Sequence, residues 1–153
     1  MARIKKNRIS GRFVAMPHNL IDSDAFKSLS NTEKIAFLYF KRDVKSSHQK
    51  EVILTFEQAK KYGVCTSPST FNRVKKKLVL SGFLDPYEPG GLGKCSVFSL
   101  SDRWKHYGTL NFKKVEPEIG FGSKYFRDAW KNENKKNELL NSRQKQKPNT
   151  NIV

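Results

Sequence analysis

Cysteine and acidic residues are scarce in this sequence of 153 residues. Cys65 and Cys95 are its two cysteines, which are too few for a disulfide framework and are expected to remain thiols. Aspartate and glutamate together number 14, against 30 lysines and arginines, so the formal net charge is +16. This charge is far from the balance usual in a cytosolic enzyme and favours a polyanionic partner. Nucleic acid is the leading candidate, with a ribosomal role or an anionic membrane surface as alternatives.

Long apolar segments are missing as well. No run approaches the roughly 20 apolar residues that a membrane-spanning helix needs. Residues 1–12 also lack the apolar segment of a secretory signal peptide. We therefore expect a protein that is made and kept in the cytoplasm, in association with the nucleoid.

Side chains that carry catalytic chemistry form no recognisable pattern. His18, His48 and His106 share no metal-ligand spacing with one another or with the cysteines. The glycine-rich segment 90–95 has some similarity to a phosphate-binding loop. However, Glu88 occupies the position of the required first glycine, and the segment ends in a cysteine where serine or threonine is needed. We expect no enzymatic activity, no metal and no cofactor.

Charge is unevenly distributed along the chain. Residues 1–12 carry five basic and no acidic side chains, residues 13–108 carry 15 and nine, and residues 109–153 carry 10 and five, giving +5, +6 and +5. Aromatic and aliphatic residues concentrate in the middle part. These shifts predict a basic N-terminal arm (1–12), one folded domain (13–108), a linker with a short helical extension (109–131), and a polar tail (132–153) that is expected to be disordered.

A capping box marks the start of the first long helix. In this box the Ser30 hydroxyl accepts from the Glu33 amide, and the Glu33 side chain accepts from the Ser30 amide. The helix is expected to run to about Arg42. Its predicted inner face consists of Ile35, Leu38 and Tyr39. Apolar residues between positions 20 and 29 predict a short leading helix before it.

A second capping box, formed by Thr55 and Gln58, predicts another helix. Gly63 is expected to end this helix in the left-handed conformation that glycine tolerates. Just before it, the apolar and β-branched segment 52–54 is long enough for one edge strand and too short for a helix.

The following helix, predicted to run from Pro68 to Leu80, has the clearest division into two faces. Ser67 supplies its N-cap, and Pro68 occupies the first helical position, where no amide hydrogen is needed. At about 100° per residue, the packing face contains Phe71, Val74 and Leu78, with Lys75 at its edge. The opposite half contains Ser69, Asn72, Arg73, Lys76 and Lys77.

A β-hairpin is predicted after this helix. Gly82 ends the helix and a strand begins directly after it, residues 86–94 form a glycine-rich loop, and residues 95–100 return as the second strand. Ser101 is expected to cap a short helix in which Trp104 packs onto the domain.

The run from Ser67 to Leu84, the glycine loop and the segment Val97–Ser101 resemble the winged helix-turn-helix DNA-binding proteins of bacterial mobile elements. The segments 13–18 and 23–26 strengthen the similarity, as do Trp104, Tyr107, Gly108 and Thr109 after the hairpin. The resemblance implies an α+β fold with a three-helix core, a short leading helix, a small antiparallel sheet and a β-wing. It implies double-stranded DNA as the partner. A transcription regulator of a mobile element is the function expected first, and a plasmid or phage replication initiator is the alternative.

In that fold, the helix 68–80 enters the major groove. Arg73 suits guanine and Asn72 suits adenine, because each side chain can form two hydrogen bonds with that base. Hydroxyls at the helix start and lysines farther along suit phosphates. The predicted DNA-binding residues are Thr66, Ser67, Ser69, Thr70, Asn72, Arg73, Lys76 and Lys77 at this helix, Lys94 on the wing, and Arg3, Lys5, Lys6 and Arg8 on the arm.

These assignments have alternatives. The lysines 75–77 also suit a solvated helix face, Arg73 also suits an intramolecular salt bridge, and the arm also suits an unstructured solubility tail. The positive charge is compatible with an RNA-binding or ribosome-associated protein, although the paired aromatic signatures of single-strand RNA modules are not recognisable.

An aromatic segment near the C-terminus has two interpretations. Residues 122–130 predict a helix whose aromatic side contains Tyr125, Phe126 and Trp130. This side either packs onto the domain or binds a second copy of the chain, and a homodimer fits paired half-sites on DNA. A protein-binding module that uses this segment is a third candidate function.

Overall fold

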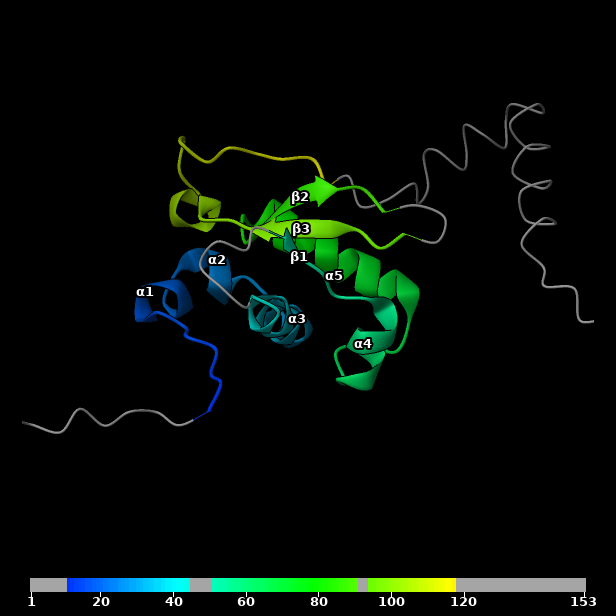
Figure 1. Ribbon diagram of the computed structural model, residues 1–153. Helices are drawn as coiled ribbons and strands as arrows, with labels where there is room; N and C mark the ends of the chain where they lie inside the picture. The colour runs from blue at the N-terminus through cyan, green and yellow to red at the C-terminus, as the bar shows by residue number, and fades with distance from the viewer. Residues whose placement is uncertain (1–10, 45–50, 91–93, 118–153) are drawn as a thin grey trace, which may run out of the picture.

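The computed structural model describes residues 11–44, 51–90 and 94–117 of the chain (Figure 1). Its α-helices are α1 (His18–Ile21), α2 (Asp24–Lys27), α3 (Asn31–Arg42), α4 (Phe56–Lys61) and α5 (Pro68–Leu80), and a 3-10 helix, η1 (Arg103–His106), follows the last strand. Its strands are β1 (Glu51–Val52), β2 (Leu84–Glu88) and β3 (Val97–Leu100). The fold is α+β, as expected. None of the helices in these ranges has the length and apolar character needed to cross a bilayer.

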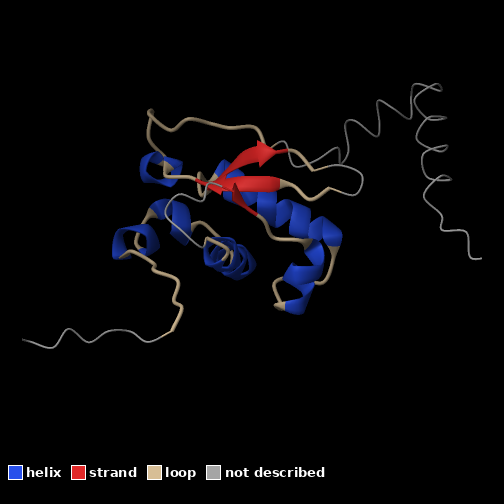
Figure 2. Ribbon diagram, viewed as in Figure 1, coloured by secondary structure: helices blue, strands red, loops and turns tan. Residues whose placement is uncertain are grey.

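The three strands form one antiparallel sheet in the order β1–β3–β2. β3 is central, with Phe98 opposite Val52 of β1 and opposite Pro86 of β2. The run 52–54 was predicted as an edge strand; an edge strand is present there, but β1 covers Glu51–Val52 and leaves Ile53 and Leu54 outside it. Figure 2, viewed as in Figure 1, shows α3 and α5 on the same side of the sheet.

Both predicted capping boxes are confirmed. At α3, the Glu33 amide donates to Ser30 Oγ over 3.4 Å and the Ser30 amide donates to Glu33 Oε2 over 2.7 Å. At α4, the reciprocal distances between Thr55 and Gln58 are 3.1 and 3.0 Å. Each box satisfies backbone amides that lack a partner inside the helix. The predicted starts of these helices are therefore correct.

The predicted inner face of α3 is wrong for Ile35 and Leu38, whereas Tyr39 packs against the core as predicted. Its buried residues are Ala36, Phe37 and Phe40, while Ile35 and Leu38 remain 42% and 37% exposed. The helix is turned so that two phenylalanines meet aromatic partners from other elements. The ring of Phe37 lies 4.9 Å from that of Phe83, and the ring of Phe40 lies 5.6 Å from that of Phe98. Such aromatic pairs add to the free energy gained by burying their area.

The prediction of a single leading helix is also wrong, because the structure has two short helices there, α1 and α2. Ser23 separates them: its hydroxyl donates to the Leu20 carbonyl over 2.6 Å and accepts from the Phe26 amide over 3.2 Å. One side chain thus closes α1 and caps α2. Of the apolar residues expected to close the core here, Leu20, Ala25 and Leu29 are buried and Phe26 packs against the core, whereas Ile21 is 42% exposed.

The hairpin differs from its predicted boundaries. β2 continues through Pro86 to Glu88, residues that were assigned to the loop, and β3 begins at Val97, so Cys95 lies outside it and is exposed. Proline is tolerated in β2 because β2 is an edge strand, where one amide hydrogen is not needed for pairing. At η1 the N-cap position is occupied by Asp102, one residue after the predicted cap.

The centre of the core is an aromatic group around Phe83, which is fully buried. The ring of Trp104 is stacked on it at 6.2 Å between centroids, and Phe26 contacts it edge-on at the same distance. Trp104 therefore packs onto the domain, as predicted. This group joins α2, α3 and η1 to the start of β2.

Candidate nucleic-acid interface

The turn between α4 and α5 is fixed by backbone and side-chain packing. Gly63 has a φ of +71°, in the region predicted for a helix-ending glycine, and the Val64 amide donates to the Ala59 carbonyl over 2.9 Å. Val64 and Cys65 are buried in the core, and burial raises the pKa of the Cys65 thiol. Cys65 is thus a packed side chain of the core. Because the turn is anchored, the start of α5 has a defined direction.

α5 has the two faces that its sequence predicts. Phe71, Val74 and Leu78 are only 3%, 2% and 0% exposed, whereas Asn72, Arg73 and Lys76 are exposed. Ser69 and Thr66 are exposed as well, and Lys77 and Thr70 are half-buried. The buried face packs against α3 and the sheet, so the polar face points away from the core.

The hydroxyl groups at the start of α5 form a local network. Ser67 Oγ accepts from the Thr70 amide over 3.2 Å and donates to Thr70 Oγ1 over 2.8 Å. Ser69 Oγ lies 3.2 Å from the same Ser67 oxygen. The single hydroxyl hydrogen of Ser67 is therefore used inside the helix cap, while Thr70 retains a hydroxyl hydrogen that can be donated outward.

Arg73 forms no salt bridge with any residue that the structure describes. Within the described ranges the ion pairs are Arg103 with Asp85 and Lys105 with Asp102, and neither involves α5. The guanidinium group of Arg73, on an exposed side chain, is available to an external acceptor. An arginine offers five donors in a planar fork, which suits either a base edge or a phosphate.

Lys75 behaves differently from the other lysines of α5. It is 9% exposed, and its Nζ lies 4.7 Å from the centroid of the Phe71 ring. Burial lowers the pKa of Lys75, and the nearby Cys95 thiol group opposes this shift electrostatically. Lys94, the predicted wing residue, is next to Cys95 and exposed.

Positive charge dominates the helix pair. Between positions 56 and 80 the sequence contains six basic residues and one acidic residue, Glu57. Glu57 lies in the first turn of α4, where a carboxylate is stabilised by the helix dipole. The exposed face of α5 therefore has no carboxylate of its own to neutralise its lysines and arginine.

Several predicted sites lie outside the described residues. They are the arm residues Arg3, Lys5, Lys6 and Arg8 and the aromatic residues Tyr125, Phe126 and Trp130. The structure therefore places Asn72, Arg73 and Lys76 on one exposed face of α5 and leaves Lys94 exposed in the hairpin, while the arm and the aromatic segment stay predictions.

The most connected polar side chain, Arg103, was not singled out from the sequence. Its Nη2 donates to the carbonyls of Val79 and Leu84 over 2.9 Å each, Nε donates to Asp85 Oδ1 over 2.6 Å, and Nη1 donates to the Lys113 carbonyl over 3.0 Å. It ties the end of α5 to β2 and to the segment after η1. Because its partners are mainly carbonyls from distant positions, no short motif marks it.

Metal ligands do not gather anywhere in the described ranges, where no group of three or more histidine, cysteine, aspartate or glutamate side chains is placed to hold an ion. Comparison of the chain with protein-family models, with curated proteins and with solved structures finds no match.

Proposed function

We propose that the chain binds double-stranded DNA as a winged helix-turn-helix domain, with α5 in the major groove and the β2–β3 hairpin as the wing. The order α3, β1, α4, α5, β2, β3 and the sheet order β1–β3–β2 support this proposal, because they place a helix pair joined by a tight turn next to a hairpin. A helix of this width fits the major groove, where every base pair has its own pattern of donors and acceptors.

The observation that carries the proposal is the contrast between the two faces of α5. The inner face is almost fully buried, while Asn72, Arg73 and Lys76 are exposed. Asparagine and arginine are the side chains that read adenine and guanine with two hydrogen bonds, and lysine binds phosphate as a mobile point charge. Their position on one exposed face gives them simultaneous access to a groove and its edge.

Regulation of transcription for a mobile element is the role that we propose first. Initiation of replication at an origin is the alternative, and both roles require recognition of a particular duplex sequence. The two differ in where the bound sequence lies relative to genes. The duplex selected by the protein from a random pool, located in the surrounding genome, distinguishes a promoter from an origin.

The proposed interface is tested by titrating the full chain with the selected duplex and measuring fluorescence anisotropy. Arg73→Ala is expected to cost about 1–3 kcal/mol of binding free energy and to relax the preference for one base. Lys76→Ala should weaken binding to all duplex sequences alike. The matched control is the double variant Lys27→Ala with Lys114→Ala, which removes two exposed positive charges that do not belong to α5 or to the hairpin.

An unchanged duplex affinity in a folded Arg73→Ala, Lys76→Ala double variant would refute the assignment of α5. An equal loss of duplex affinity in this double variant and in the control variant would mean that net charge alone governs binding. Tighter binding to structured RNA than to any selected duplex would favour the RNA-binding alternative.

A further inference from the structure

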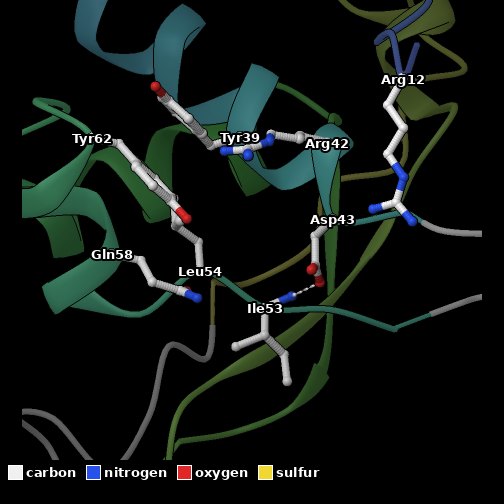
Figure 3. A pocket seen from close by; sticks show the side chains of 8 residues that line it. All are labelled: Arg12, Tyr39, Arg42, Asp43, Ile53, Leu54, Gln58 and Tyr62. Carbon is white, nitrogen blue, oxygen red and sulfur yellow. Dashed lines mark hydrogen bonds between the residues drawn. The ribbon is translucent and has the colours of Figure 1, made fainter.

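A cavity of about 200 Å³ lies between the end of α3 and α4 (Figure 3). It is lined by Arg12, Tyr39, Arg42, Asp43, Ile53, Leu54, Gln58 and Tyr62. None of these residues belongs to α5 or to the hairpin. The volume is below the roughly 300–1,000 Å³ of pockets for drug-sized ligands and well above the roughly 30 Å³ that one water occupies. It therefore suits a small group or a small molecule.

One wall of the cavity is a stacked pair of tyrosines with an arginine beside it. The rings of Tyr39 and Tyr62 are 4.4 Å apart and inclined by 10°. The guanidinium carbon of Arg42 lies 5.9 and 5.4 Å from their centroids. These two distances are nearly equal, so the guanidinium group lies beside the pair and not on the outer face of one ring. The guanidinium group is thus near the edges of both rings, and its N–H groups remain able to donate to a ligand.

Arg42 has no acceptor for those N–H groups within the described part of the chain, where the ion pairs involve Arg103 and Lys105 instead. Arg12 brings a second guanidinium group from the opposite side of the cavity, as Figure 3 shows. Asp43 is the one carboxylate in the lining, and its Oδ2 accepts from the Ile53 amide over 3.3 Å. Two positive groups and one negative group leave the lining with an excess of positive charge.

Gln58 adds a neutral donor. Its Oε1 is used in the capping box of α4, where it accepts from the Thr55 amide over 3.0 Å. The amide nitrogen is therefore the part of this side chain that faces a ligand, and Figure 3 shows it directed toward Leu54 at the cavity. The hydroxyl group of Tyr62 is also directed inward. The lining thus offers donors from several sides.

We propose that this cavity binds a phosphate group carried by a small free molecule. A phosphate monoester has about −1.5 to −2 charges at neutral pH and three acceptor oxygens, which match two guanidinium groups and an amide donor. A single carboxylate would satisfy only one of the arginines. The cavity lies between helices and apart from α5 and the hairpin, so a compact ligand suits it better than a continuous DNA backbone. This site is separate from the proposed DNA interface.

The probe is inorganic pyrophosphate, titrated into the full chain by calorimetry at an ionic strength held constant with sodium chloride. Saturable binding to one site is expected. Arg42→Gln should weaken it by roughly tenfold or more, because a hydrogen bond to a charged group contributes about 1.5–3 kcal/mol. Arg73→Gln is the matched control, since it removes an exposed arginine of α5 and should leave pyrophosphate binding unchanged.

A second variant, Gln58→Glu, separates ligand binding from folding. Glutamate retains the acceptor of the capping box, so α4 should remain intact with an unchanged melting temperature. It replaces the amide donor with a negative charge, so pyrophosphate binding should be lost. No saturable binding by the original chain, or equal binding by the original chain and all three variants, would overturn the proposal.

The same variants identify the source of the phosphate group. If the phosphate group belongs to a free small molecule, Gln58→Glu should leave the affinity for duplex DNA unchanged, and pyrophosphate should not compete with the duplex for binding. Competition between the two, with a parallel loss of duplex affinity in Gln58→Glu, would assign the cavity to the DNA backbone and overturn the proposal of a free ligand. Failure of the proposed DNA interface would appear separately, as unchanged duplex binding in the α5 variants.

Discussion

At the scale of single residues, Gly82 combines two requirements that only glycine meets. Its φ is +82°, and a Cβ atom built on it would lie 2.6 Å from the backbone nitrogen of Trp104. The Trp104 amide donates to the Gly82 carbonyl over 3.0 Å. Gly63 meets only the first requirement, because its φ is +71° but nothing lies within 4 Å of a built Cβ. A comparison of alanine variants at these two positions therefore separates the effect of backbone strain on stability from the effect of steric overlap.

Gly82→Ala is predicted to destabilise the protein clearly more than Gly63→Ala. The Gly63 variant should lose about 1–2 kcal/mol, the usual cost of a left-handed residue with a side chain. The Gly82 variant should lose the same free energy of unfolding, and the added Cβ atom must also push η1 away from the end of α5. Urea denaturation of both variants measures the difference. Equal losses would show that the contact with Trp104 relaxes without cost.

Lys75 is a second residue whose environment differs from that of its neighbours. Its folded-state pKa is lowered from the usual 10.5 by burial. Below the lowered pKa both states are protonated, and the folded state bears the full cost of the buried ammonium group. Between the lowered pKa and 10.5 the unfolded state binds more protons, so stability should rise with pH in that alkaline window.

Lys75→Met removes the buried charge and retains a long apolar side chain. The variant is predicted to be more stable than the original chain at pH 7, and its advantage should shrink as the pH approaches 10.5. Urea denaturation at pH 7 and pH 10 measures this change. Lys76→Met, at an exposed position, is the control and should show no such change. If the gain in stability of Lys75→Met did not change with pH, the Lys75 ammonium group would have to be solvated in the folded state.

At the scale of elements, the rotation of α3 decides which of its side chains hold the domain together. Phe37 contacts the core ring of Phe83, while Ile35 is largely solvated. The apolar positions alone suggested the opposite assignment for Ile35. The helix contains more large apolar and aromatic residues than one face can bury, so its sequence pattern allows two orientations. Its aromatic partners, Phe83 directly before β2 and Phe98 on β3, select one of them.

This orientation predicts unequal effects of two truncations on one helix. Phe37→Ala should cost about 3–5 kcal/mol, because it removes a buried ring and leaves a cavity. Ile35→Ala should change stability by about 0.5 kcal/mol or less, as is usual at exposed positions. Thermal unfolding of both variants gives the comparison. A larger loss for Ile35→Ala would restore the orientation predicted from the sequence.

At the scale of the whole molecule, the charge of +16 makes the proposed DNA binding sensitive to salt. If about six phosphates are contacted, affinity should fall roughly a thousandfold between about 50 and 200 mM salt. Anisotropy titrations at several salt concentrations give the slope, and Lys76→Ala should reduce it by about 1. An affinity that does not change with salt would exclude the phosphate contacts on which the proposal depends.

The sequence by itself determined the features that depend on a few neighbouring residues. The caps at Ser30, Thr55 and Ser67 were predictable because each hydrogen bond joins residues three positions apart. The two faces of α5 were predictable because Phe71 and Leu78 repeat with the period of a helix. The net charge follows from composition alone.

Tertiary structure decided the rest, because the contacts involved join distant parts of the chain. The rotation of α3 depends on the rings of Phe83, just before β2, and of Phe98 on β3, and Arg103 depends on carbonyls from α5, β2 and the segment after η1. The cavity beside Arg42 exists because Tyr39 and Tyr62 stack across two helices. Local periodicity carries no information about such pairings, so the second proposed site became visible only in the folded protein.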